Sequence, residues 1–303
     1  MTNPTFRLGR KPADPTTPKL RLSALLTGTA PSYPENIDWL SRVGHWPMYL
    51  NDRIGDCTCA TAGHIIQALS TYGKNVTETI TDNDVLDAYV AVSGYNPITG
   101  TNDDGAVVQK VLDHWRKNGI GGHKILAFAS VDFKNNAELR QAIHIFGNVY
   151  LGINFPDTAM EQFHGGKPWD VVPGARIEGG HAINAGYYDV SDNMWKIVTW
   201  GKVQSMTQAF WDKYVEEAWV VVSPEWYDLA GKNPEGIDMA AMGDEFTKIT
   251  GEASPFPASP PTPSPVVNPT DEDFVKMARS WLSSKPRFYK DFQRKLQKWV
   301  DTK

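Results

Sequence analysis

The sequence is poor in cysteine and has no long apolar run. Its two cysteines, Cys57 and Cys59, are too few for a disulfide framework, and we expect both to be free thiols. No apolar stretch is long enough to span a membrane, and the N-terminus lacks the basic and apolar pattern of a signal peptide. The formal net charge of −5 does not favour nucleic acid or an anionic membrane as a partner. We therefore expect cytoplasmic synthesis and neither of these partners.

Sequence patterns that bind metals and common cofactors are missing as well. The seven histidines are scattered, and no histidine pair lies with a carboxylate at the spacing of metal ligands. The chain contains no P-loop and no GxGxxG motif. We therefore expect no metal and no cofactor.

Composition divides the chain into four segments. Residues 1–34 are rich in proline, threonine and basic residues, which predicts an extended arm that wraps the domain or reaches a partner; a disordered tail is the alternative. Residues 35–252 hold the main domain, and residues 253–269 form a Pro/Ser/Thr-rich linker. Residues 270–303 have the pattern of two short helices. Because so short a hairpin rarely folds alone, we expect it to dock a protein partner, although it could pack on itself.

Hydrophobic periodicity predicts helices mainly in the first half of the main domain and strands mainly in the second. Helices are predicted at 57–72, 82–92, 105–118, 136–145 and 207–216. Strands are predicted at 124–131, 149–155, 181–188, 195–200 and 218–222. This order predicts an α+β fold class.

The stretch from Asn51 to His64 reads as a turn that leads into a helix. Gly55 permits a tight turn, and Asp56 is a favourable N-cap residue whose carboxylate can accept backbone N–H groups. Cys57 then lies in the first turn, where the helix dipole lowers the pKa of a thiol. Cys57 is therefore a candidate nucleophile, and a buried structural cysteine is an equally supported interpretation.

His181 begins an apolar strand in the second half of the domain. Gly179 and Gly180 precede it, and two glycines allow another backbone or a substrate to approach closely. A histidine at such a strand end could take a proton from Cys57, which is how a thiol is activated at neutral pH. The alternative is a hydrogen-bonded histidine of the core.

Four segments resemble, in order, those of papain-like cysteine peptidases. They are 51–64 (the turn and the cysteine helix), 104–120 (a second long helix that ends in Gly-Ile), 136–153 (the helix that leads into the β half) and 180–201 (the histidine strand and a later Val-Thr-Trp-Gly). The resemblance implies a helical half that carries the cysteine and an antiparallel β half that carries the histidine.

The resemblance also implies roles for individual residues. Cys57 would be the nucleophile and His181 the base, and Asn51 would help to stabilise the oxyanion in place of the family's glutamine. Trp200 would shield the histidine pair. Cys59 is a rival nucleophile, but we expect its side chain to point inward.

The third catalytic position departs from the family pattern. Val198 stands where the family has the asparagine that orients the histidine, and a valine cannot do this. Thr199, the next residue, has a hydroxyl that could replace it if the strand register differs.

The resemblance therefore predicts a thiol-dependent hydrolase that acts by acyl transfer on a peptide or a peptidoglycan stem. The alternative is a papain-fold protein with weak or no catalysis that serves as a structural or binding component. The Gly-Asp-Cys and Gly-Gly-His pairing with an incomplete third position resembles proteins encoded by bacteriophages and actinobacteria, including virion-associated ones.

Overall fold

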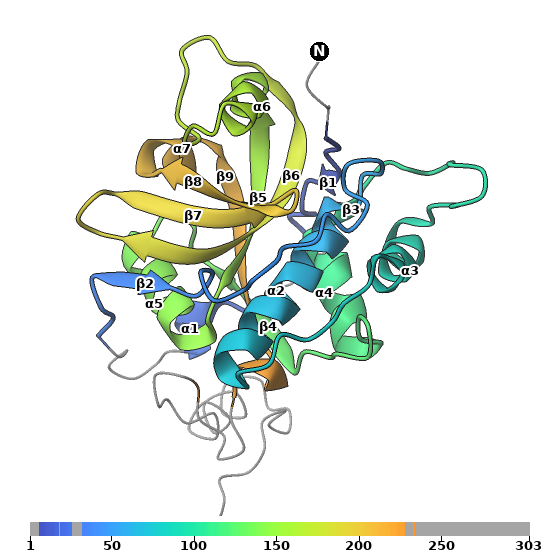
Figure 1. Cartoon of the computed structure of the whole chain (residues 1–303), viewed down its shortest axis with the longest axis horizontal. Coiled ribbons are helices and arrows are strands. Elements are labelled where there is room, and N and C mark those ends of the chain that lie inside the picture. Colours follow the sequence, from blue (N-terminus) through green and yellow to red (C-terminus); the bar gives the residue numbers. More distant parts are fainter. Residues whose placement is uncertain (1–5, 18, 26–31, 228–232, 234–303) are drawn as a thin grey trace, which may run out of the picture. The chain divides into compact units, whose positions relative to one another are not determined.

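The structure combines a group of helices with an antiparallel sheet (Figure 1). Of the 303 residues in the chain, the computed structural model describes 6–17, 19–25, 32–227 and 233. The predicted linker at 253–269 and the predicted hairpin at 270–303 lie outside the described residues. The predicted α+β fold class is confirmed for the main domain.

The helical half is built around α2. Its elements are α2 (Cys57–Gly73), α3 (Asp82–Ser93) and α4 (Val108–Lys117). Helix α3 begins at a capping box formed by Thr81 and Asp84, and it ends at Gly94 in the left-handed conformation. Nearly all of α2 is buried, since it contacts α3, α4 and the sheet. The N-terminus of α2 therefore faces both halves of the domain.

The β half is a seven-stranded antiparallel sheet in the order β4–β9–β5–β6–β7–β8, with β2 also paired to β6. Its strands are β2 (Asn36–Asp38), β4 (Ala127–Val131), β5 (Val149–Pro156), β6 (Ile177–Asp189), β7 (Met194–Thr199), β8 (Lys202–Thr207) and β9 (Val215–Val222). On β6, His181 lies opposite Ile153 of β5. This register places the histidine in the middle of the sheet, where its surroundings are buried.

The remaining helices pack against the sheet, and a 3-10 turn packs against α2. They are α1 (Leu22–Leu25), α5 (Asn136–Phe146), α6 (Asp157–His164), α7 (Gln208–Tyr214) and the 3-10 turn η1 (Pro224–Trp226). Asn135 caps the start of α5 by accepting the backbone N–H of Glu138, and Gly147 ends it in the left-handed conformation. Helix α6 and strand β8 were not predicted, because α6 is short and β8 is largely polar.

The helix predicted from residue 105 begins only at Val108. Gly105 has φ +77°, which a helix cannot accommodate, and the next two residues form strand β3 (Ala106–Val107). Strand β3 pairs in parallel with β1 (Arg10–Lys11) of the N-terminal arm. The prediction is therefore wrong for these three residues. Gly105 adopts a left-handed conformation, and pairing with β1, which is distant in sequence, places Ala106 and Val107 in a strand.

Candidate active site

The first residue of α2 is Cys57, and its thiol faces the strand that carries His181. The backbone N–H of Ala182 lies against the thiol and favours its charged form. Cys57 is 1% exposed. The second cysteine, Cys59, is wholly buried within the domain, as its expected inward orientation requires. The fold therefore brings the Cys57 thiol next to the His181 strand.

His181 has a polar partner on one ring nitrogen. Its Nε2 lies 2.7 Å from the hydroxyl oxygen of Thr199 on the neighbouring β7, and both side chains are buried. The ring of Trp200 stacks on the imidazole with the centroids 4.3 Å apart. Nδ1 of His181 has no hydrogen-bond partner within the described ranges. The structure thus brings His181, Thr199 and Trp200 together, whereas it does not join the Cys57 thiol to His181 by a hydrogen bond.

Asn51 is held in place by an unusual turn. The two residues before it, Tyr49 and Leu50, have φ of 54° and 68°, a conformation that costs free energy for residues other than glycine. The Asn51 side chain is buried and donates from Nδ2 to the carbonyl oxygens of Ile54 (3.1 Å) and Arg7 (3.4 Å). The amide predicted to stabilise an oxyanion therefore already binds a carbonyl oxygen, which the N-terminal arm supplies.

The N-terminal arm runs between the helical half and the sheet, and we call the space that it fills the groove. We call residues 6–11 the covering segment. The N–H of Gly9 donates to the carbonyl oxygen of Gly180 at 3.1 Å, and the N–H of Ala106 donates to the carbonyl oxygen of Gly9 at 2.8 Å. The N–H of Gly9 also lies against the Cys57 thiol. The segment therefore runs past the candidate nucleophile with backbone contacts to both sides of the groove. In Figure 1, β1 and β3 lie side by side near the start of α2.

Glycines make this close passage possible. A Cβ atom on Gly9 would lie 1.8 Å from the carbonyl oxygen of Gly55, and one on Gly105 would lie 1.8 Å from the carbonyl oxygen of Gly9. On the other wall, a Cβ on Gly180 would lie 2.2 Å from the carbonyl oxygen of Arg10. The described part of the arm therefore wraps its own domain. Of the two glycines before His181, Gly180 receives the backbone of Arg10 and Gly179 receives the side chain of Leu8.

Aromatic residues hold the start of the covering segment. Phe6 stacks on Trp200 with the ring centroids 5.2 Å apart and meets Phe163 edge to face at 5.6 Å. Trp200 also donates from Nε1 to the carbonyl oxygen of Arg7 at 3.4 Å. Trp200 therefore covers one face of the His181 ring, and it also contacts the covering segment through its stacking on Phe6 and its Nε1 hydrogen bond to Arg7.

Burial under the covering segment reverses the expected charges of the nucleophile and the base. It raises the pKa of the Cys57 thiol to about 12 and lowers the pKa of His181 to about 3. The expectation that the helix N-terminus lowers the thiol pKa is therefore wrong for this conformation, because loss of solvent outweighs the dipole. The pair is neutral at pH 7.

Asp56 does not act as the predicted side-chain cap. Its backbone occupies the N-cap position, but its side chain makes no capping hydrogen bond. Among the described residues, neither carboxylate oxygen has a partner in good hydrogen-bond geometry. Burial raises the pKa of this carboxyl well above its usual value, and the nearby Asn51 amide offsets only part of this rise. The carboxyl group is therefore buried beside the nucleophile rather than bound to the helix terminus.

The structure also shows site residues that the sequence did not indicate. Arg10, in the covering segment, extends into a pocket in the β half, where its Nε donates to Oε1 of Glu217 at 2.6 Å. Both side chains are almost fully buried. No sequence signal pairs residues so far apart, since the two belong to no common motif.

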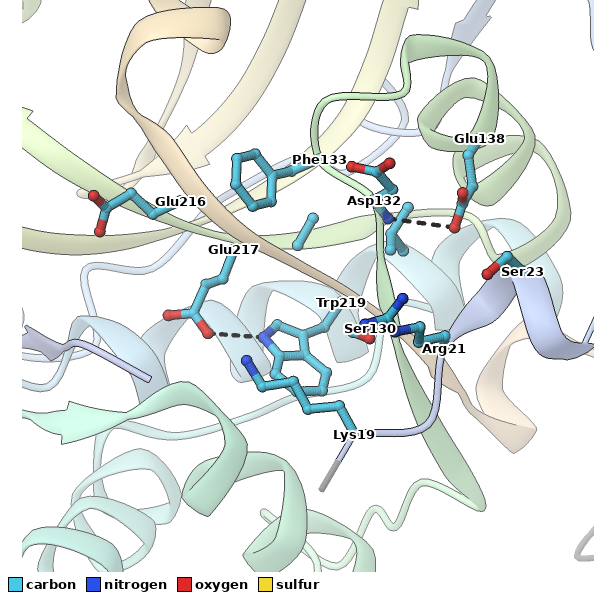
Figure 2. A pocket seen from close by; sticks show the side chains of 12 residues that line it. Lys19, Arg21, Ser23, Ser130, Asp132, Phe133, Glu138, Glu216, Glu217 and Trp219 are labelled. Atoms are coloured by element: carbon cyan, nitrogen blue, oxygen red, sulfur yellow. Dashed lines mark hydrogen bonds between the residues drawn. The ribbon is translucent and has the colours of Figure 1, made fainter. Parts of the chain in front are cut away.

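A cavity of about 530 Å³ lies beyond Glu217, and Figure 2 shows its walls. Glu217 and Trp219 of β9 form one side, and Asp132 and Phe133 at the end of β4 form another. Lys19 lies with its ammonium 5.5 Å from the Trp219 ring centroid. None of the predicted catalytic residues lines this cavity, so it is separate from the groove at Cys57. It adjoins the pocket of Arg10, with which it shares Glu216, Glu217 and Trp219.

In the described part of the chain, no helix is long and apolar enough to cross a bilayer. Within the same residues, no three or more His, Cys, Asp or Glu side chains gather in a way that would hold a metal ion.

Comparison with known proteins gives matches in structure and none in sequence. No family model matches the chain, and no curated protein sequence matches it. The fold is similar to that of xylellain, a cysteine protease from Xylella fastidiosa, with a TM-score of 0.55 and 13% identity over 74% of this chain and 99% of that one.

Two further solved structures have similar folds. The digestive procathepsin L 3 of Tenebrio molitor larval midgut aligns with a TM-score of 0.50 and 10% identity over 67% of this chain and 76% of that one. A procathepsin B of Trypanosoma congolense aligns with a TM-score of 0.50 and 10% identity over 72% of this chain and 87% of that one. The chain therefore has the papain-like fold that the sequence resemblance implied.

Proposed function

We propose that this papain-like chain is a thiol-dependent hydrolase that cleaves peptides through Cys57 and His181. One observation carries the proposal. The groove already holds an extended peptide, the covering segment, with Gly9 against the Cys57 thiol and backbone hydrogen bonds to both walls. A groove that binds a peptide backbone past a thiol suits a linear peptide substrate. That the substrate is the stem peptide of peptidoglycan is a narrower prediction.

The proposed reaction is acyl transfer. With Nε2 of His181 donating to Thr199, Nδ1 is the nitrogen that takes the proton of the Cys57 thiol. The thiolate attacks the carbonyl carbon of the peptide bond, and the Asn51 amide stabilises the oxygen that becomes charged. His181 then gives the proton to the leaving nitrogen as the C–N bond breaks. Water attacks the thioester, and the acid product leaves with the thiol restored.

We further propose that the described conformation is the covered, inactive form. The group that Gly9 turns to the thiol is its N–H, and its carbonyl oxygen is bound by Ala106. The covering segment therefore offers no carbonyl carbon for attack. Its departure would expose the nucleophile and the base to water, which moves both pKa values back toward their usual ranges.

The test is hydrolysis of a fluorogenic peptide library by full-length variants. The Gly9→Val chain, in which the covering segment clashes with Gly55, should hydrolyse peptides, and adding Cys57→Ala or His181→Ala should abolish this. Cys59→Ala is the matched control and should retain the rate. An equal rate with and without Cys57 would contradict the proposal. Absence of hydrolysis in every variant would favour the alternative, a papain-fold structural or binding protein.

The resemblance to virion-associated proteins supports a narrower proposal, that the hydrolase is carried in a phage particle. Its docking surface would be the hairpin predicted at 270–303, which follows the predicted linker. This hairpin lies outside the described residues. Co-purification of the chain with intact particles would test this, and its recovery only in the unassembled fraction would contradict it.

A further inference from the structure

The side chain of Arg10 enters a pocket that is shaped for it. Nε donates to Oε1 of Glu217 at 2.6 Å, and Nη1 lies 3.5 Å from both the carbonyl oxygen of Ile153 and Oε2 of Glu216. The Arg10 side chain is 2% exposed. A guanidinium is rarely so buried unless its hydrogen bonds are satisfied, and this pocket supplies acceptors on two of its nitrogens.

Other residues hold the pocket open and orient its carboxylate. Trp219 donates from Nε1 to Oε2 of Glu217 at 2.9 Å, as Figure 2 shows, so each oxygen of Glu217 has its own donor. A Cβ on Gly152 would lie 2.5 Å from Nε of Arg10 and 2.6 Å from the Glu217 side chain. The missing side chain at Gly152 therefore makes the room that the guanidinium occupies.

We propose that Glu217, the Ile153 carbonyl and the space over Gly152 form a guanidinium-binding site of the groove that selects peptides with arginine. In a bound peptide, the arginine would be next in sequence to the residue that lies against Cys57, just as Arg10 is next to Gly9 in the covering segment. The selection of substrates rests on the proposed hydrolase function, whereas the binding of arginine does not. In the covered form the chain's own Arg10 fills the site.

The geometry favours arginine over lysine. The contacts use two different nitrogens of one planar fork, and a lysine has a single ammonium that cannot reach both Glu217 and Ile153 in this way. Glu216 contributes less, because its side chain is 45% exposed and its contact with Arg10 is long. The selectivity is therefore assigned to the buried Glu217.

Binding of a peptide in trans tests the site without catalysis. The protein is the full chain with Gly9→Val and Arg10→Ala, and Cys57→Ala to prevent turnover. The probes are fluorescent peptides with the sequence of residues 6–11, one with arginine and one with uncharged citrulline at the place of Arg10. We expect the arginine peptide to bind at least tenfold more tightly by anisotropy. Adding Glu217→Gln should reduce this preference to less than threefold, and Glu216→Gln, the matched control, should keep most of it.

Two results would overturn the proposal: equal affinity for both peptides, which includes no binding of either, or a preference that survives Glu217→Gln. If the triple variant does not fold, the chain with Arg10→Ala and Cys57→Ala, in which the covering segment stays in place but the guanidinium site is empty, is titrated with ethylguanidinium and with uncharged ethylurea, and the same preference is expected. Hydrolysis then separates the two claims. If the arginine peptide binds more tightly but the Gly9→Val chain hydrolyses no peptide, the guanidinium site is supported and the hydrolase function is rejected. If the chain hydrolyses peptides but shows no preference for arginine, the hydrolase function is supported and the guanidinium site is rejected.

Discussion

The backbone N–H of Gly9 donates to the carbonyl oxygen of Gly180 at 3.1 Å, and this hydrogen bond fastens the N-terminal arm to the strand that carries His181. The contact lies one residue from the candidate base and beside the candidate nucleophile. In this structure, six residues of the same chain therefore cover the candidate site. Three predictions concern this covered site.

Gly9→Val should uncover Cys57. Any side chain at this position meets the carbonyl oxygen of Gly55, so the covering segment must leave the groove. We expect iodoacetamide to label Cys57 at least tenfold faster at pH 7.5, because the pKa of a solvated thiol falls from about 12 toward its usual range. Mass spectrometry reads Cys57 and the buried Cys59 separately, and Cys59 serves as the internal control.

A substitution outside the contact provides the matched variant for this experiment. Lys11→Val changes an exposed side chain of the same segment and should leave the labelling rate of Cys57 unchanged. If Gly9→Val labels no faster than the natural chain, the covering segment does not limit access to the thiol.

Thr199→Val should weaken hydrolysis in the uncovered Gly9→Val chain. The substitution keeps the shape of the side chain but removes the hydroxyl that lies 2.7 Å from Nε2 of His181. Losing one partner of a buried hydrogen bond costs about 1–3 kcal/mol, which corresponds to a roughly tenfold to hundredfold lower rate if the imidazole loses its orientation. The rate should be compared across pH, because a misoriented base changes the profile as well as the maximum.

Thr199→Ser separates the hydroxyl from the methyl group. The serine variant retains the oxygen and should keep most of the rate, whereas equal losses in both variants would indicate a packing role. A valine variant with full activity would show that Thr199 does not position His181.

Asp56→Asn should stabilise the protein at neutral pH. The folded-state pKa of Asp56 lies well above its value in the unfolded chain, because the carboxyl is buried without a partner in good hydrogen-bond geometry among the described residues. Stability from the protonated carboxyl is complete below the unfolded pKa of about 3.9 and declines as the pH rises toward the folded value. Each unit of pKa difference is worth about 1.4 kcal/mol, and asparagine avoids this loss.

Urea unfolding at pH 7.5 and pH 4 measures the effect. The gain of Asp56→Asn over the natural chain should amount to about 1 kcal/mol or more at pH 7.5 and shrink toward zero at pH 4. Asp52→Asn, at an exposed position in the same turn, is the control and should show little change at either pH. A destabilised Asp56→Asn chain at pH 7.5 would mean that the carboxylate is charged and paired.

Much of the fold could be predicted from local patterns. The helix that starts at Cys57 follows from a glycine turn and a long apolar face, and the strand after His181 follows from its apolar run. The contact between Thr199 and His181 depended on strand register, which apolar alternation left open by one residue. Thr199 was therefore predicted only as a conditional third member.

The covering segment could not be located in this way. Its contacts are mostly between backbone groups, which carry no side-chain signal, and they depend on glycines at 9, 55, 105 and 180 that are far apart in sequence. The expected charged forms of Cys57 and His181 were wrong for the same reason, because the covering segment buries both side chains. A helix dipole can be read from sequence, but burial by a distant segment cannot.

The ion pair between Arg10 and Glu217 also sets an order of events when the chain is made. The two residues are separated by 207 positions, and Glu217 belongs to β9, the last strand of the sheet. During synthesis from the N-terminus, Arg10 emerges first and has no partner until nearly all of the domain has left the ribosome. Formation of this ion pair is therefore among the last steps of folding, and a nascent or truncated chain that lacks β9 cannot form it.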